Sequence, residues 1–340
     1  MSAATKPALP LGLLLTSVHD RSVPPSKQIA EHRELISMAH QLGFDLVVAG
    51  QHFGAPTLRY LQPVPYLATI AAQFPDMRVA TGIILLPLHH PLTVAEEVAT
   101  LDAVTGGRVV MGLGIGYSQD EFDAFGIDRT TRTDRFEESI EIIRALWSGE
   151  AVTHHGEFFQ LDDVQTSTLP VQEPHPPIWI GAQAERSVRR AARFADAWYV
   201  PPFPTHRELI ELYANYLEER EAHGRRAKTA IPVRRELYLA NTVAEAEAAV
   251  SAGASSRYET YSSWGLDLDN GLGKDQWLDN RFVLGDAETV AESLSYLMGE
   301  VEHSDFIYKP QWPGQDHSQT MAQLEMFGTK VVPLLSPPTP

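Results

Sequence analysis

The stretch RVATGIILLPLHHPLTVAEEVATLDAVTGGRVVMGLG, residues 78–114, holds two apolar runs separated by a helical pattern. The runs at 78–87 and 108–114 are rich in Val, Ile and Leu, which favours buried strands. Residues 93–107 between them predict a helix that ends at two glycines. A strand, a helix and a second strand in this order predict neighbouring strands of a parallel sheet.

The same alternation continues along the chain in both directions. Eight strand–helix units favour a closed (β/α)8 barrel, a TIM barrel of the α/β class, over an open doubly wound sheet. We expect one domain over residues 1–340, with irregular insertion or lid segments at 149–176 and 254–281. The predicted strands are 11–18, 44–50, 78–87, 108–114, 177–182, 196–200, 232–240 and 305–310, and the predicted helices are 27–42, 63–73, 93–107, 131–147, 185–195, 205–223, 243–253, 286–299 and 317–335.

Composition narrows the class of protein. The 340 residues include 27 basic and 44 acidic side chains, a net charge of −17, which argues against binding to nucleic acid or to an anionic membrane. The chain has no cysteine, so disulfides, thiolate metal sites and a cysteine nucleophile are excluded. No apolar run approaches the ~20 residues of a membrane span, and the first ten residues do not form a secretory signal. We therefore expect a cytoplasmic enzyme.

In a barrel of this kind the active site lies where the strands end. The predicted strand ends carry histidine and aromatic residues and few carboxylates, a composition that suits a planar aromatic cofactor better than a metal ion. His52 follows the second strand directly and is either a catalytic group or a loop histidine. No lysine or paired carboxylate is evident at a strand end, which argues against an aldolase or a metal-free hydrolase.

Two glycine-containing turns are candidate cofactor contacts. The turn GLGIG at 112–116 lacks side chains, so it either lets the backbone approach a flat ring or simply makes a tight turn. It is not a dinucleotide fingerprint. The segment GAQAERSVRR at 181–190 starts a helix straight after a strand, and helix N-termini bind phosphate. There Arg186 and Ser187 either add contacts to a phosphate or are ordinary helix surface.

Several segments resemble the luciferase-like flavin-dependent oxidoreductases, the family of bacterial luciferase and its monooxygenase relatives. The likeness spans most of residues 9–335, and the block that ends in GRVVMGLGIG is its most specific part. The segments are VVAGQHF (47–53), ATGIILLPLHHPLTVAEEVATLDAVTGGRVVMGLGIGY (80–117), RTDRFEESIEIIRALWSGEAVTHHGEFF (132–159), PPIWIGAQAERSVRRAARFADAW (176–198) and QWPG (311–314).

The resemblance implies a flavin at the strand ends, either reduced FMN or a reduced 8-hydroxy-5-deazaflavin coenzyme. It places His52 beside the flavin and a non-proline cis peptide at Gly82–Ile83 behind it. It also implies a flavin-contacting turn and a phosphate site. The residues of the turn are Gly114, Gly116 and Tyr117, and those of the phosphate site are Gly181, Ala182, Gln183, Arg186 and Ser187.

Two positions depart from the family pattern. Relatives have an acidic residue before the histidine where this chain has Gln51, which argues against a proton relay through that neighbour. Relatives often have a serine where this chain has Ala184, so either Ser187 or Arg186 contributes more to the phosphate site, or cofactor binding is weak. Weak binding would suit a flavin that arrives as a diffusing substrate.

The leading functional prediction is a monooxygenase that uses reduced FMN from a separate flavin reductase, together with O2, to oxygenate a small organic substrate. His52 would hydrogen-bond the flavin or act as general base. Two alternatives are a deazaflavin-dependent reductase or dehydrogenase and a flavin-binding protein without turnover. The family likeness also implies a homodimer. The expected substrate-pocket residues are Phe53, Tyr199, Gln311 and Trp312.

Overall fold

The structure is a computed structural model that describes residues 9–15, 19, 21–55, 58–225, 230–251 and 281–335. Its strands run parallel in one curled sheet, in the order β11-β10-β12-β1-β2-β3-β5-β8-β9, with β4 paired to β5. A separate hairpin, β6–β7, is antiparallel. The strands are β1 Leu11–Leu15, β2 Leu46–Ala49, β3 Arg78–Thr81, β4 Ile84–Leu85, β5 Val109–Gly114, β6 Val152–His155, β7 Gln160–Val164, β8 Ile178–Gly181, β9 Ala197–Tyr199, β10 Ile231–Leu239, β11 Phe282–Gly285 and β12 His303–Tyr308.

The sheet closes on itself between β9 and β10. Val200 and Val233 form a parallel bridge, in which the Val200 N–H donates to the Pro232 carbonyl at 3.0 Å and the Arg234 N–H donates to the Val200 carbonyl at 3.1 Å. Eight described strands therefore form a ring, while β11 pairs with the C-terminal half of β10. This arrangement confirms the predicted barrel.

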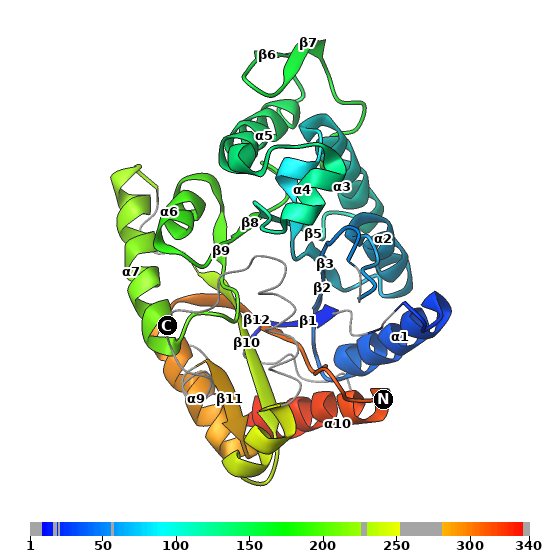
Figure 1. Cartoon of the computed structure of the whole chain (residues 1–340), viewed down its shortest axis with the longest axis vertical. Coiled ribbons are helices and arrows are strands. Elements are labelled where there is room, and N and C mark those ends of the chain that lie inside the picture. Colours follow the sequence, from blue (N-terminus) through cyan, green and yellow to red (C-terminus); the bar gives the residue numbers. More distant parts are fainter. Residues whose placement is uncertain are drawn as a thin grey trace.

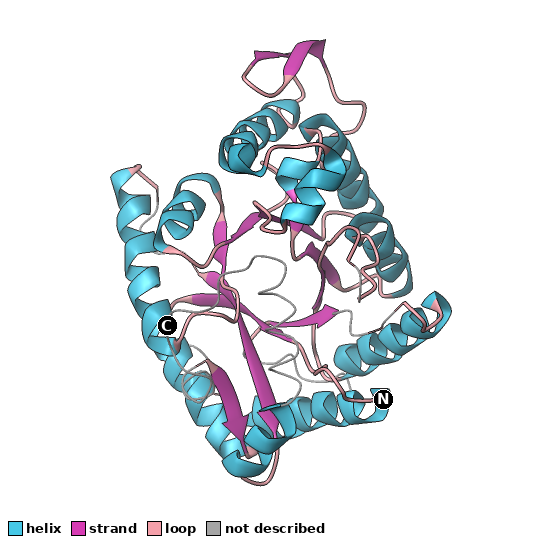
Figure 2. Cartoon of the chain, viewed as in Figure 1, coloured by secondary structure: helices cyan, strands magenta, loops and turns pink. Residues whose placement is uncertain are grey.

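Helices surround the ring of strands and bury their apolar faces against it (Figure 1; Figure 2). A second, smaller apolar cluster fills the barrel interior and includes Leu14, Val48, Val110 and Ile307. The helices are α1 Pro25–Gln41, α2 Pro63–Gln73, α3 Pro91–Thr105, α4 Gln119–Phe125, α5 Arg132–Leu146, α6 Glu185–Phe194, α7 His206–Ala222, α9 Ala287–Glu300 and α10 His317–Met326, with residues 243–251 also helical.

The third predicted strand, 78–87, is not continuous. It breaks between β3 and β4 at Gly82–Ile83, where the peptide is cis, and continues into a short 3-10 turn at Leu86–Leu88. Glycine fits at position 82 in this arrangement because a Cβ there would lie only 2.2 Å from Val48 Cγ1. The cis peptide that the family likeness implied is thus present.

Three further elements differ from the prediction. Residues 149–176 contain the β6–β7 hairpin, which projects from the barrel beyond α5 in Figure 1, where we expected only an irregular segment. Helix α4 and strand β11 were not predicted at all. The expected lid at 254–281 lies outside the described residues except for Arg281. Within the described part of the chain, no helix has the length and apolar character needed to cross a membrane.

Candidate active site

His52 lies just past the end of β2 and is held by a carboxylate from α4. Its Nδ1 is 3.1 Å from Glu121 Oε1, and the same oxygen accepts a hydrogen bond from the Phe53 N–H at 2.7 Å. The two side chains are 13% and 5% exposed. Because an ionised carboxylate only accepts hydrogen bonds, the hydrogen of a neutral His52 sits on Nδ1 and leaves Nε2 as the basic nitrogen.

Aromatic residues complete the surroundings of His52. The Tyr117 hydroxyl lies 3.4 Å from His52 Nε2, and the rings of Tyr60 and Tyr117 meet the imidazole edge to face at centroid distances of 4.8 and 5.7 Å. The imidazole is therefore fixed in orientation by a carboxylate on one nitrogen and a phenol near the other. This is the geometry of a group that passes a proton at a defined position.

Gln51, at the position where the family resemblance implied an acidic residue, takes part in a different network. Its Oε1 accepts from the Leu85 N–H at 2.9 Å and lies 3.0 Å from His89 Nε2, and its Nε2 donates to Gln62 Oε1 at 2.9 Å. Burial lowers the pKa of His89, which keeps this imidazole neutral. Gln51 therefore connects the end of β2 to the β3–β4 segment by hydrogen bonds. The carboxylate beside His52 comes from Glu121.

Ile83 lies at the border of two apolar clusters. It packs against the interior cluster that includes Tyr199 and against a second cluster with Phe53. A Cβ at Gly114 would lie 1.8 Å from Ile83 Cδ1, and one at Gly181 would lie 3.4 Å from Ile83 Cγ2. Gly114 therefore makes room for Ile83, a reason that sequence reasoning did not supply, whereas a Cβ at Gly181 would be in ordinary van der Waals contact.

The third glycine of the turn has a different role. Gly116 has φ +73°, a left-handed conformation that favours glycine, and the ring of Phe122 packs 3.1 Å from where its Cβ would be. The tight-turn alternative therefore holds for Gly116. Whether the turn also contacts a flavin stays a prediction.

The predicted phosphate site, at the start of α6, borders a cavity of about 470 Å³. Gln183, Ala184 and Glu185 form one side of the cavity, and Phe203, Pro204 and Leu212 lie on the other. Its charged lining residues are Glu185, Glu208, Glu211 and Arg281. The helix N-terminus and Arg281 favour an anion, whereas the three carboxylates oppose one, and phosphate binding at this site stays a prediction.

The side chains expected to reinforce that site are differently engaged. Ser187 Oγ accepts from the Ala184 N–H at 3.1 Å and donates to the Ala184 carbonyl at 2.7 Å, so its hydroxyl caps the first turn of α6. Arg186 is exposed, and the buried Ala182 accepts at its carbonyl from Trp198 Nε1 at 2.8 Å. Gln183 lines the cavity.

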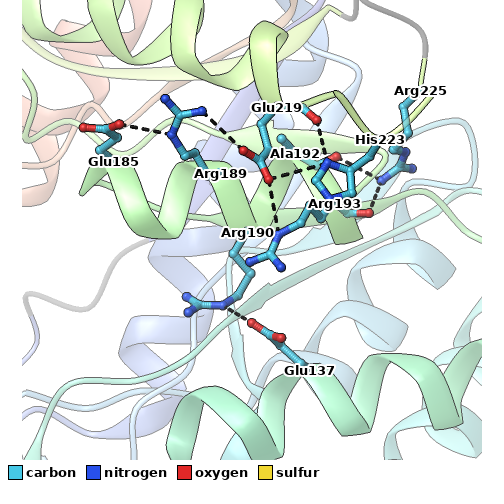
Figure 3. A network of polar contacts seen from close by, with 9 residues as sticks. All are labelled: Glu137, Glu185, Arg189, Arg190, Ala192, Arg193, Glu219, His223 and Arg225. Atoms are coloured by element: carbon cyan, nitrogen blue, oxygen red, sulfur yellow. Dashed lines mark hydrogen bonds and ion pairs between the residues drawn. The ribbon is translucent and has the colours of Figure 1, made fainter. Parts of the chain in front are cut away.

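The other arginines of α6 form ion pairs with nearby carboxylates, as Figure 3 shows for Arg189, Arg190 and Arg193. Arg189 lies 3.0 Å from Glu185 and 3.3 Å from Glu219, and Arg190 lies 2.6 Å from Glu137 of α5. These ion pairs tie α6 to α5 and α7. The arginine-rich sequence of this helix therefore serves packing rather than anion binding.

The expected pocket residues lie in three different places. Phe53 contacts Phe125 and His89 at ring-centroid distances of 4.8 and 5.7 Å. Tyr199 lies inside the barrel with Trp179, at 5.7 Å. Trp312 and Gln311 are buried beyond β12, and Trp312 Nε1 donates to the Leu237 carbonyl at 3.0 Å.

Two charged features of the site were missed. The expectation of no strand-end lysine was wrong, because Lys309 directly follows β12, where it forms an ion pair with Glu236 of β10. Glu121 was missed because α4 was not predicted. A signal was present, since Ser118, two acidic residues and a closing Gly126 are typical of a short helix.

The described residues suit a flat aromatic cofactor with a phosphate tail. The mouth offers Ile83 and aromatic rings for a planar group, a basic imidazole nitrogen, and a cavity at a helix N-terminus whose volume falls in the usual range for small-molecule sites. No group of three or more His, Asp or Glu side chains among the described residues could hold a metal ion.

Curated relatives include two named monooxygenases. The 4-hydroxyprotoasukamycin monooxygenase of Streptomyces nodosus subsp. asukaensis is 28% identical over 63% of this chain and 60% of its own length. The oxygenase component of the flavin-dependent trigonelline monooxygenase of Acinetobacter baylyi is 26% identical over 68% of this chain and 64% of its own length. The matches to the first curated relatives span 49–60% of those proteins' lengths.

Solved structures share the fold over nearly the whole chain. The monooxygenase RslO1 from Streptomyces bottropensis has a TM-score of 0.81 at 24% identity and covers 96% of this chain and 99% of its own. The FMN complex of the oxygenating constituent of 3,6-diketocamphane monooxygenase from Pseudomonas putida has a TM-score of 0.80 at 20% identity (98% and 100% covered). An F420-dependent secondary alcohol dehydrogenase has a TM-score of 0.77 at 19% identity (98% and 100% covered).

The sequence model of one family, described as luciferase-like monooxygenase, matches residues 9–300 of this chain. That range contains most of the barrel, the cis peptide at Gly82–Ile83, and the His52–Glu121 pair. The chain belongs to the luciferase-like monooxygenase family.

Proposed function

We propose that this protein is the oxygenase component of a two-component flavin monooxygenase, which oxygenates a small organic substrate with O2 and reduced FMN from a separate reductase. The observation that carries the proposal is the oriented imidazole of His52, held by Glu121 at the mouth of a luciferase-like barrel. Bound reduced FMN would supply the chemistry that activates O2, because this chemistry belongs to the cofactor. The protein would bind and orient the flavin and the substrate, and it would exclude water from the site.

The residues of the mouth divide these tasks. Ile83 and the glycines around it provide a shaped apolar surface for the flat ring, and the N-terminus of α6 takes the phosphate. His52 accepts or returns a proton at Nε2, while Glu121 keeps the hydrogen on Nδ1. Phe53 and Tyr199 exclude water from either side of Ile83.

The carboxylates at the phosphate cavity support the two-component arrangement. Glu185, Glu208 and Glu211 weaken the hold on a dianion, so FMN should exchange between this protein and its reductase. Two of the similar proteins carry matching names, an "oxygenase component" and an "oxygenating constituent".

An anaerobic titration tests the cofactor. The pure protein is titrated with reduced FMN and with reduced 8-hydroxy-5-deazaflavin coenzyme, and binding is followed by flavin fluorescence. Preferential binding of reduced FMN, followed by formation of an oxygenated product when substrate and O2 are added, is the expected result. Preferential binding of the deazaflavin, with hydride transfer in the absence of O2, would replace the proposal by the reductase alternative. Binding of neither would reject both.

A further inference from the structure

A second, much smaller cavity lies at the ends of β1 and β2 and is called the β1–β2 cavity below. Its volume is about 20 Å³, which is room for one water-sized group. Leu15 and Ala49, the last residues of the two strands, line it together with Gly50. Its other lining residues come from α1, from α2 and from the segment between β2 and α2, and they are Gln28, His32, Arg59, Tyr60, Leu61 and Tyr66.

Gln28 of α1 brings an unsatisfied acceptor to the β1–β2 cavity. Its side chain is 1% exposed, and its Nε2 donates to the Arg59 carbonyl at 3.4 Å. Its Oε1 is buried and has no hydrogen-bond partner in the described structure. A buried acceptor without a donor is unfavourable, so this amide oxygen needs an O–H or N–H group beside it.

The segment around Arg59 prevents Gln28 from solving this by turning its amide. The Arg59 N–H donates to the His19 carbonyl at 3.0 Å, and the guanidinium donates to the carbonyls of Arg21 and Val23. The Arg59 carbonyl is therefore held in place beside Gln28. An exchange of Oε1 and Nε2 would set two carbonyl oxygens against each other, so Oε1 stays the end that lacks a partner.

Size and charge narrow the kind of donor that fits. A space of about 20 Å³ admits a hydroxyl group but no ring. Among the described residues that line the cavity there is no Asp or Glu, so an ammonium donor would be buried without a carboxylate to offset its charge. The Tyr66 hydroxyl lies 3.0 Å from His32 Nδ1, and burial raises the pKa of Tyr66 to about 12, so that hydroxyl is also neutral. A neutral hydroxyl is the donor that suits these surroundings.

The β1–β2 cavity adjoins the His52 site. Tyr60 lines the cavity, and its ring meets the imidazole of His52 at a centroid distance of 4.8 Å. Gly50 also lines it, and a Cβ at this position would lie 3.0 Å from the carbonyl oxygen of Gly82, at the cis peptide. A group bound in the cavity is therefore about one aromatic ring away from the imidazole.

We propose that Gln28 accepts a hydrogen bond from a hydroxyl group of the organic substrate, so that the substrates of this enzyme are phenols or alcohols. The inference rests on the proposed function for the reaction but not for the binding. The hydroxyl occupies the β1–β2 cavity, and the rest of the substrate lies beside Tyr60, toward His52. An ordered water supplies the same O–H group, and the experiment distinguishes these two sources.

Binding of matched probes, followed by ligand-observed NMR, tests whether the donor belongs to a ligand. The probes are phenol and benzyl alcohol, with toluene and ethylbenzene as partners in which a methyl group replaces the hydroxyl. The hydroxyl preference is the Kd of the methyl probe divided by that of the hydroxyl probe. Gln28→Met removes the acceptor and should lower this preference about tenfold for at least one pair. Gln28→Glu should keep it, because a protonated carboxyl offers the same donor and acceptor.

Gln73→Met is the matched control. Gln73 is also a helical glutamine that donates to a backbone carbonyl, at 2.9 Å, but it is exposed on α2. Its replacement should leave the hydroxyl preference unchanged.

The outcomes separate this inference from the proposed function. A preference that is equal in Gln28→Met and the wild type would mean that Gln28 is structural or bonds only a water, and it would overturn the inference, as would a failure of every probe to bind. If Gln28→Met does not fold by circular dichroism, the side-chain amide resonance of Gln28 in the wild type decides, because phenol and not toluene should shift it. Binding of reduced FMN without an effect of Gln28→Met rejects the inference alone. The reverse result rejects the proposed function and leaves the hydroxyl site standing.

Discussion

The imidazole of His52 owes its orientation to a carboxylate that comes from 69 positions further along the chain. Glu121 Oε1 serves both His52 Nδ1 and the Phe53 N–H, so a single oxygen fixes the ring and the backbone that carries it. The second oxygen, Oε2, is buried without a hydrogen-bond partner in the described structure. A carboxylate held in this way is a costly feature, which favours a functional role over a structural one.

We predict that Glu121→Gln lowers the rate of substrate oxygenation at least tenfold with less than about 1 kcal/mol loss of stability. The amide oxygen of glutamine still accepts from His52 and Phe53, so the geometry survives while the charge that stabilises a protonated imidazole is lost. Steady-state kinetics of Glu121→Gln, His52→Gln and the double variant measure the effect. If the pair acts as one unit, the double variant is no slower than the slower single variant. Fully additive losses would contradict a shared role.

The position of His52 at the mouth of the barrel could be predicted from sequence, because it follows directly from strand order. Its partner could not, because Glu121 reaches His52 only after α4 folds back over the end of β2. The same limit explains Lys309 and Glu236, which lie on strands that meet only when the barrel is formed. Local patterns indicate which residues end a strand, and tertiary contacts decide which of them meet.

Gly114 offers a prediction about packing at the mouth. Gly114→Ala places a Cβ 1.8 Å from Ile83 Cδ1, so we expect a loss of about 2 kcal/mol in the free energy of unfolding. Ile83→Val removes the clashing methyl group and should alone cost about 1 kcal/mol. The two changes together should cost at least about 1 kcal/mol less than their sum, measured by urea denaturation. Additive losses would show that Ile83 does not need the space that Gly114 leaves.

At the scale of elements, α7 begins with a histidine in an unfavourable place for a positive charge. His206 is the first residue of the helix, where the helix dipole opposes a cation, and its Nε2 is buried without a hydrogen-bond partner. Burial, and then the charge of Arg235, lower the pKa of His206 to about 4. The folded protein therefore keeps this imidazole neutral at mildly acidic pH.

The expected consequence is a loss of stability between pH 6.5 and pH 4. Over that range the unfolded chain binds a proton at His206 that the folded protein does not, so falling pH favours unfolding by about 2 kcal/mol after allowance for partial exposure. His206→Gln should remove this part of the pH dependence. Urea denaturation of both proteins at pH 7.5 and pH 4.5 measures the difference. Equal pH dependence in the two proteins would contradict the assignment.

Elements with strong periodicity could be predicted closely, as with α2, where the expected and observed residues, 63–73, agree. The break between β3 and β4 could not be read from the apolar run alone, because Ile83 and Ile84 suit a continuous strand. Gly82 fits there because Val48 of the neighbouring strand occupies the space of a Cβ. The hairpin β6–β7 was missed because its short strands are half exposed and carry histidines and aspartates.

For the whole molecule, eightfold alternation was enough to predict a closed ring, but it did not show where the ring is weakest. Strand β2 pairs along its full length with both β1 and β3, through four register pairs on each side. Between β9 and β10 the structure has one bridge, with Pro232 beside it lacking an N–H. Tyr199 and Arg234 lie next to this seam. The barrel is thus least supported between β9 and β10.

We predict that the β9–β10 seam opens more readily than the rest of the ring. The amides of Val200 and Arg234 should exchange with solvent deuterium at least about tenfold faster than that of Val48, a difference of about 1.4 kcal/mol in local opening. The seam itself is a single bridge with two hydrogen bonds, whereas β2 is bracketed by two complete ladders. Native-state hydrogen exchange resolved by residue measures this directly. Equal protection at all three sites would refute the weak seam.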